Sequence, residues 1–331
     1  MRKVLSRIGK TGAAAGIAVF WLLPPGVATA SQSFAVDLTT DGMSQFNVAH
    51  TTRGLRLGPQ LAATATGGEE RQGFYVTTAI GTRSLANRIR PIMMADLPPG
   101  SDVLLELRGQ TRSSRWTEWR EARQGSDEVV LPASSTQLQA RITLTQRGAG
   151  QGPEVYGLRL LVVDPARGRP EAVTEPAPKP LTSRVFATRI GQIGDKTANG
   201  HTIATTDRFV ALPSRRALNA DTTERAYEVK ICYATRCVIA PIWDVGPWNV
   251  RDDYWNNAAT RDMWADLPQG KPQAQAAYLD GYNSGRDDRS RKVRNPAGID
   301  LADELFWQDL GMTTNDWVNV TYLWTDVESL V

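Results

Sequence analysis

A proline-rich segment near the middle of the chain, residues 165–180, sets the first limit on how this sequence can fold. It holds five prolines and almost no large apolar side chains. This composition predicts an extended, semi-rigid linker, because proline fixes the backbone and there is no apolar surface to bury. We therefore expect two domains, at residues 31–164 and 182–331, joined by a linker at 165–181.

The first thirty residues have the pattern of a bacterial export signal. Four basic residues precede an apolar stretch at 13–23, and small residues follow at 28–30. The apolar stretch is short for a bilayer span and is followed by Pro24 and Pro25. We predict a signal peptide at 1–30, a mature chain without a membrane span, and a secreted, extracellular or envelope-associated location. A retained membrane anchor is the alternative.

The charge balance excludes one class of partner. The chain has 38 basic and 35 acidic residues, and four basic but no acidic residues fall in the predicted signal peptide, which leaves 34 against 35. Lys and Arg are interspersed with acids and form no basic stripe. We therefore expect no nucleic acid as a partner.

The half before the linker has the alternating pattern of β-strands. Apolar side chains occupy every second position at 103–107 and again at 138–144, and Gly, Pro and Ser punctuate the runs. Alternation places one set of side chains on one face of a sheet. We predict an antiparallel β-sandwich of the jelly-roll kind.

The half after the linker reads as six short strands with few helices. Helical patterns occur only at 272–282 and 302–310, so the strand-helix alternation of a parallel sheet is absent. This pattern favours a small six-stranded β-barrel with short helices, and a mainly β chain overall. The strand-like runs are 184–189, 209–212, 227–232, 237–243, 298–301 and 317–324.

The chain has two cysteines, Cys232 and Cys237, with four residues between them. In an oxidising, exported setting, two cysteines facing each other across a hairpin predict a disulfide. A catalytic or metal-binding pair is the alternative, although the spacing is not C-x-x-C and His is scarce. The acidic spacing at 280–285 also fails the pattern of a calcium loop, so we expect no metal and no cofactor.

Two aspartates stand where predicted strands end. Asp244 ends an apolar run and is followed within three residues by a Gly-Pro turn. Asp300 ends the run at 298–301, next to the predicted helix at 302–310, whose N-terminus it could cap. Two such carboxyl groups suit glycoside chemistry, in which one group protonates the leaving oxygen and another stabilises the sugar cation. The alternative is that both only hold turns and the helix start.

This order of motifs resembles rare lipoprotein A and the expansins, which are cell-wall-active proteins. The likeness rests on D-x-G-P at 244–247, I-D-L at 299–301 with a following helix, and the run into Cys232. It implies a double-psi β-barrel whose partner is a cell-wall polysaccharide, either peptidoglycan or a related glycan. By the same likeness, Asp244 matches the acid proposed to serve glycan cleavage in rare lipoprotein A, and Asp300 matches the acid that expansins share with related endoglucanases.

One position departs from the cleaving enzymes of this kind. They carry a His before a Leu-Pro pair, whereas this chain has Phe209 in the run that ends at Leu212-Pro213. His201 is a candidate spatial replacement and hence a candidate substrate contact. The departure favours binding over cleavage.

An insertion at 249–295 lies between the two aspartates and is rich in aromatic and charged residues. Ring faces beside charged groups are what a pyranose groove uses. We predict substrate contacts from Trp248, Tyr254 and Trp255. The alternative is that these rings build a core for the insertion.

The front domain resembles the galactose-binding jelly-roll modules of secreted bacterial hydrolases. The likeness rests on Trp116-Thr117-Glu118-Trp119 and the closing run at 155–163. It implies that Trp116 or Trp119 contacts a glycan, with a core position or a purely structural module as the alternative.

Three functions remain open for the whole chain. The first is an expansin-like protein that binds and loosens wall polysaccharide without breaking bonds. The second is an enzyme, a lytic transglycosylase or glycosidase, that uses Asp244 as proton donor with Asp300 to orient or stabilise charge. The third is an adhesion or scaffold protein.

Overall fold

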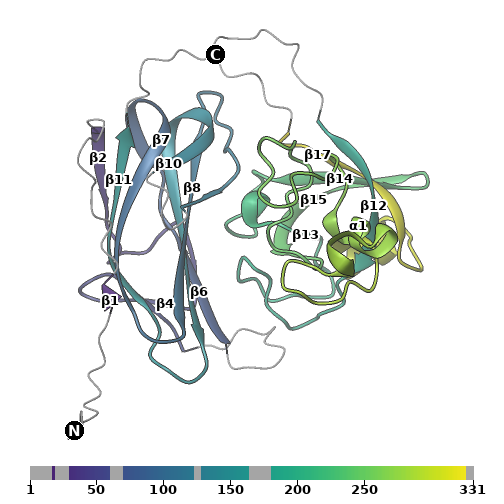
Figure 1. Cartoon of the computed structure of the whole chain (residues 1–331), viewed down its shortest axis with the longest axis horizontal. Helices are drawn as coiled ribbons and strands as arrows, with labels where there is room; N and C mark the ends of the chain where they lie inside the picture. The colour runs from purple at the N-terminus through teal and green to yellow at the C-terminus, as the bar shows by residue number, and fades with distance from the viewer. Residues whose placement is uncertain (1–16, 19–29, 60–69, 123–127, 164–179, 326–331) are drawn as a thin grey trace, which may run out of the picture.

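The computed structural model describes residues 17–18, 30–59, 70–122, 128–163 and 180–325. These residues form two sheets with few helices, and the second sheet closes into a six-stranded barrel (Figure 1). The prediction of a mainly β chain with a C-terminal barrel is confirmed. Most of the predicted signal peptide and linker lies outside the described residues.

The front sheet has eleven strands, all paired antiparallel. Its two long strands, β7 and β10, change partners partway along: β10 pairs with β7 in its first half and with β8 and β6 in its second. One continuous sheet therefore supplies both layers around the front core. The strands are β1 (Ile17–Ala18), β2 (Ala30–Val36), β3 (Ser44–Phe46), β4 (Val48–His50), β5 (Leu55–Leu57), β6 (Glu70–Val76), β7 (Ile80–Leu97), β8 (Ser101–Gln110), β9 (Arg120–Glu121), β10 (Val129–Arg147) and β11 (Glu154–Val163).

The barrel closes in the order β12-β16-β13-β15-β14-β17. The pairs β12–β16 and β13–β15 are parallel and the others are antiparallel. Each predicted run coincides with one strand, because apolar side chains such as Val185, Val210 and Ile299 fill the interior. The strands are β12 (Thr182–Arg189), β13 (Val210–Leu212), β14 (Glu228–Tyr233), β15 (Arg236–Val245), β16 (Ala297–Leu301) and β17 (Asp316–Tyr322).

Short helices connect the barrel strands. The first predicted helix is α1 (Gln273–Asp280), while the second contains a π-helical turn, η3 (Leu305–Asp309). Two 3-10 turns complete the set, η1 (Arg215–Ala217) and η2 (Tyr282–Gly285). Within the described ranges, no helix has the length and apolar composition that a membrane-spanning helix requires.

Cys232 and Cys237 form the predicted disulfide. They are cross-strand partners in the hairpin of β14 and β15. The bridge therefore joins two strands that are already paired, and it stiffens one hairpin of the barrel.

The barrel packs against the sandwich on the side of β6 and β8 (Figure 1). Trp119 is fully buried at this junction and donates its indole N–H to the carbonyl of Leu218 at 3.1 Å. Two guanidinium groups, of Arg108 and Arg141, lie 4.3 and 4.4 Å from its ring centre. One apolar cluster runs from Phe74 and Trp119 into the barrel core, so the two domains share a core.

The buried charges at the junction are paired. Arg141 makes a two-pronged contact with Glu106 at 2.6 and 2.8 Å, and Arg108 contacts Glu224 of the barrel at 2.5 Å. Burying an unpaired charge costs several kcal/mol. Because these charges are paired, the barrel can cover the charged face of the sheet without that cost.

Candidate functional site

Asp244 and Asp300 lie on either side of one alanine. Ala211 on β13 pairs with Asp244 on β15 and also with Asp300 on β16. Cross-strand partners project to the same face of a sheet. Val210 and Leu212, the neighbours of Ala211, face the barrel core, so the two acids lie on the opposite, outer face.

The backbone at Gly246 lies next to the carboxyl group of Asp300. Gly246 is two residues after Asp244, and a Cβ built on it would lie 3.6 Å from Oδ2 of Asp300, which is ordinary van der Waals contact. The carboxyl group of Asp300 therefore reaches the backbone just beyond Asp244. Because both acids pair with Ala211, the register of the barrel strands brings them to neighbouring positions.

Asp244 is held by the backbone of the segment between β12 and β13. Its Oδ1 accepts the N–H of Ala198 at 2.8 Å. Burial raises the pKa of Asp244 to about 6, although the N–H groups of Val245 and Ala198 oppose the rise. Asp244 is therefore mostly ionised at neutral pH.

Asp300 is the more strongly shifted acid. Burial raises its pKa to about 7, and the negative charge of Asp244 adds to the rise. The hydroxyl of Thr188, its cross-strand partner on β12, donates to Oδ1 and lowers the pKa in part. About half of the Asp300 carboxyl groups carry a proton near pH 7, so this residue can donate a proton while Asp244 supplies a negative charge.

His201 lies between β12 and β13, in the segment whose Ala198 N–H bonds Asp244. Its Nε2 is 2.6 Å from the carboxylate of Asp207, and its ring meets Trp243 edge-on at 5.1 Å. Phe209, which replaces the expected His, is fully buried and stacks on Trp243 at 5.3 Å. The ring contacts of His201 thus tie it to Asp207 and Trp243, and the structure does not bring it to Asp244 or Asp300.

Tyr254 and Trp255 are core rings. Their exposed fractions are 0% and 1%. The Tyr254 hydroxyl donates to the carbonyl of Gly298 at 2.9 Å, and Trp255 stacks on Tyr322 at 5.7 Å. Both rings belong to the apolar cluster that the barrel shares with the sandwich, and not to a separate core of the insertion.

Trp248 lies closer to the acids along the chain, just after Gly246 and Pro247. Its indole N–H donates to Asn295 at 2.8 Å, and its ring packs against the cluster of Ala274, Ala277 and Val293. The ring is half-buried, so part of it stays in contact with solvent.

One neighbour of Asp300 carries no motif in the sequence. Thr188 donates to its carboxyl group, and this contact depends on the pairing of β12 with β16. An exposed ring lies in the helical turn η3 that follows β16: Trp307 is 41% exposed, and the guanidinium of Arg189 lies 5.4 Å from its ring centre. Arg189 pairs with Leu301, the residue after Asp300.

The described residues contain no group of three or more His, Cys, Asp or Glu side chains arranged to hold a metal ion. A family model described as a domain of unknown function, DUF8814, matches residues 181–321. That range covers the barrel almost from end to end and includes both acids. A search of curated proteins found no match to the chain.

Proposed function

We propose that this protein is exported and binds a cell-wall polysaccharide across the barrel face that carries Asp244 and Asp300. The pairing of both acids with Ala211 is the observation that carries this proposal. It puts two half-buried carboxyl groups of different protonation state on one face, where sugar hydroxyls can both donate to and accept from them.

An exposed ring completes such a surface. Pyranose rings present C–H faces that pack on indole rings, and Trp307, in the helical turn that follows the strand of Asp300, is 41% exposed. The likeness to rare lipoprotein A and the expansins supports the cell wall as the source of the glycan, and the predicted export signal supports contact with it. Fold likeness alone does not assign activity, so the acids carry the argument.

Cleavage of the glycan is the second candidate, and the different pKa values of the two acids favour it. The higher pKa of Asp300 reverses the roles expected from the sequence, where Asp244 was the proton donor. Protonated Asp300 would donate to the glycosidic oxygen as the C–O bond breaks, and ionised Asp244 would stabilise the sugar cation. A hydroxyl of the same sugar would then add to the cation and return its proton to Asp300. That sequence consumes no water and leaves an anhydro-sugar end.

Incubation of the mature protein with purified peptidoglycan and with β-glucans tests both candidates. Binding predicts that the protein pellets with the insoluble glycan, and Asp244→Asn combined with Trp307→Ala should weaken pelleting by about tenfold or more. Asp280→Asn, at an exposed acid on α1, is the matched control. Failure of the wild-type protein to pellet with either glycan would exclude the proposal.

Mass analysis of the soluble fraction separates binding from cleavage. Soluble fragments with anhydro-sugar ends, lost in Asp300→Asn, would establish the enzyme. Pelleting without fragments would establish the binding protein.

A further inference from the structure

A hollow lies where the sandwich meets the barrel. It consists of two adjoining cavities of about 690 and 500 Å³. Trp116 from the sandwich and Trp324 from the barrel line both cavities, so the two hollows meet at these rings. We call the pair of cavities the junction groove. It is separate from the acid pair, since neither Asp244 nor Asp300 lines it.

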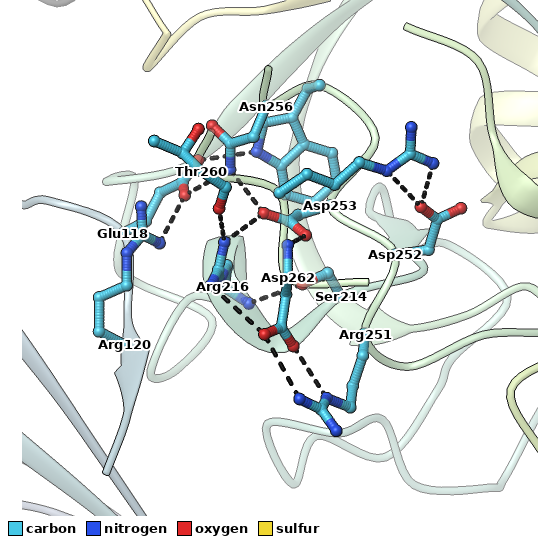
Figure 2. Close-up of polar contacts among 12 residues, drawn as sticks. Glu118, Arg120, Ser214, Arg216, Arg251, Asp252, Asp253, Asn256, Thr260 and Asp262 are labelled. Atoms are coloured by element: carbon cyan, nitrogen blue, oxygen red, sulfur yellow. Dashed lines mark hydrogen bonds and ion pairs between the residues drawn. The ribbon is translucent and has the colours of Figure 1, made fainter. Parts of the chain in front are cut away.

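Glu118 lines the junction groove and belongs to a network of polar contacts with Arg120 and Asn256 (Figure 2). Glu118 is 8% exposed, and its Oε1 accepts the indole N–H groups of Trp255 at 2.7 Å and Trp324 at 2.9 Å. Its Oε2 accepts from Asn256 and from Arg120, both at 2.9 Å. One carboxylate thus holds two tryptophans in place, which reduces the entropy that a ligand would have to remove on binding.

Trp116 is supported from the sandwich side. The guanidinium of Arg108 lies 4.4 Å from its ring centre, and Arg108 is itself fully buried and bonded to Gln139 at 2.6 and 2.9 Å. The Trp116 ring is half-buried and lines the groove with its remaining surface. The groove therefore presents rigid aromatic surface from both domains.

The charges of the groove compensate one another. Three glutamates and three arginines line it, the arginines being Arg115, Arg120 and Arg225. Each glutamate also pairs with an arginine: Glu118 with Arg120 at 2.9 Å, Glu224 with the buried Arg108 at 2.5 Å, and Glu228 with Arg225 at 3.5 Å. Compensated charges attract neither a polyanion nor a polycation. Fixed rings beside satisfied polar groups instead suit an uncharged ligand that has apolar faces and many hydroxyls.

From these observations we infer that the junction groove binds a neutral oligosaccharide. Sugar rings would stack on Trp116 and Trp324, while side chains at the rim such as Asn257 and Thr260 would bond to hydroxyls. The volume is in the range of pockets that hold small ligands, and domain interfaces are frequent places for such sites. The inference does not require the acid pair to bind or to cleave anything.

Two neighbouring alanines allow a sharp test. Ala259 lines the groove and Ala258 does not, and both are exposed. Ala259→Phe should fill the groove without removing any contact, and Ala258→Phe adds the same bulk outside it. Calorimetric titration with a neutral hexasaccharide of β-1,4-linked N-acetylglucosamine should show binding to the wild type and to Ala258→Phe. Ala259→Phe should weaken that binding by about tenfold or more, and equal melting temperatures would show that the fold is intact.

Three results would overturn the inference: no binding of the hexasaccharide to the wild type, unchanged affinity in Ala259→Phe, or tighter binding of an anionic hexagalacturonate. A further variant, Asp300→Asn, distinguishes the two sites. Binding that survives Asp300→Asn but not Ala259→Phe belongs to the junction groove. Binding lost in Asp300→Asn but kept in Ala259→Phe supports the acid face and removes the junction groove as a site.

Discussion

Trp255 of the barrel donates its indole N–H to Glu118 of the sandwich at 2.7 Å, across 137 residues of sequence. Burial disfavours the charge of Glu118, but Arg120 and the hydrogen bonds of Asn256 and Trp324 together lower the pKa of Glu118 below its usual value. This carboxylate is therefore ionised, buried and shared by both domains. The junction behaves as an interior rather than as a contact between independent bodies.

Glu118→Ala should destabilise the whole protein. The change leaves two indole N–H groups, an amide and a guanidinium without their acceptor, and breaking a buried ion pair costs about 3 kcal/mol or more. Chemical denaturation followed by tryptophan fluorescence measures the loss, with Asp102→Ala at an exposed site as control. The wild type should unfold in one transition because the domains share a core; two separate transitions would contradict this account.

The alternating pattern of the front half predicted correctly which residues form its core. It did not predict that the barrel covers one outer face of the sheet. Leu105, Leu107, Leu138 and Ala140 are buried in the sandwich, as period-two alternation requires. The positions between and after these residues, Glu106, Arg108, Gln139 and Arg141, are charged or polar, which on a lone sheet indicates a face in water. The sequence carries no signal that the barrel covers Glu106 and the arginines next to it, because the pairing partners lie in another domain.

Loss of the disulfide should cost stability but not the barrel. Replacing both Cys232 and Cys237 by Ser frees a loop of a few residues, for which chain entropy gives about 2 kcal/mol. The strands β14 and β15 stay paired through their backbone ladder. A lower midpoint of urea denaturation with an unchanged circular dichroism spectrum is the expected result. Collapse of the β signal would show that the hairpin depends on the bridge.

Asp300→Asn should make stability less dependent on pH. The folded-state pKa of about 7 lies above the unfolded value near 3.9, so the folded protein holds a proton that the unfolded chain has lost between those values. This contribution to stability is complete below about pH 4 and is lost as pH rises through 7. Asparagine stays neutral throughout.

The free energy of unfolding of Asp300→Asn, relative to that of the wild type, should therefore increase from pH 5 to pH 8. For this half-buried group we expect an increase of about 2 kcal/mol. Urea denaturation at both pH values measures it, and Asp280→Asn controls for the loss of a carboxylate elsewhere. If the unfolding free energy of Asp300→Asn relative to the wild type instead decreases as pH rises, the folded-state pKa of Asp300 is not raised.

The positions of Asp244 and Asp300 at strand ends could be predicted from the sequence, but the residues that surround them could not. Each aspartate ends an apolar run beside a turn or a helix, which is a local pattern. Whether an aromatic ring in the insertion faces solvent depends on how the insertion packs, and Trp255 is buried because Glu118 of the other domain accepts its N–H. Thr188 was missed for the same reason, since only the parallel pairing of β12 and β16 brings it to Asp300.

Thr188→Val should raise the pKa of Asp300 further. The threonine hydroxyl donates to Oδ1 and so favours the ionised form, while valine has nearly the same shape and no donor. Carbon-detected NMR of the Asp300 carboxyl group across a pH titration reads the pKa directly, and any pH profile of glycan binding or cleavage should shift the same way. Thr188→Ser keeps the hydroxyl and should restore the wild-type value. If Val and Ser variants titrate alike, Thr188 fills space on the barrel surface and does not set the protonation of the acid pair.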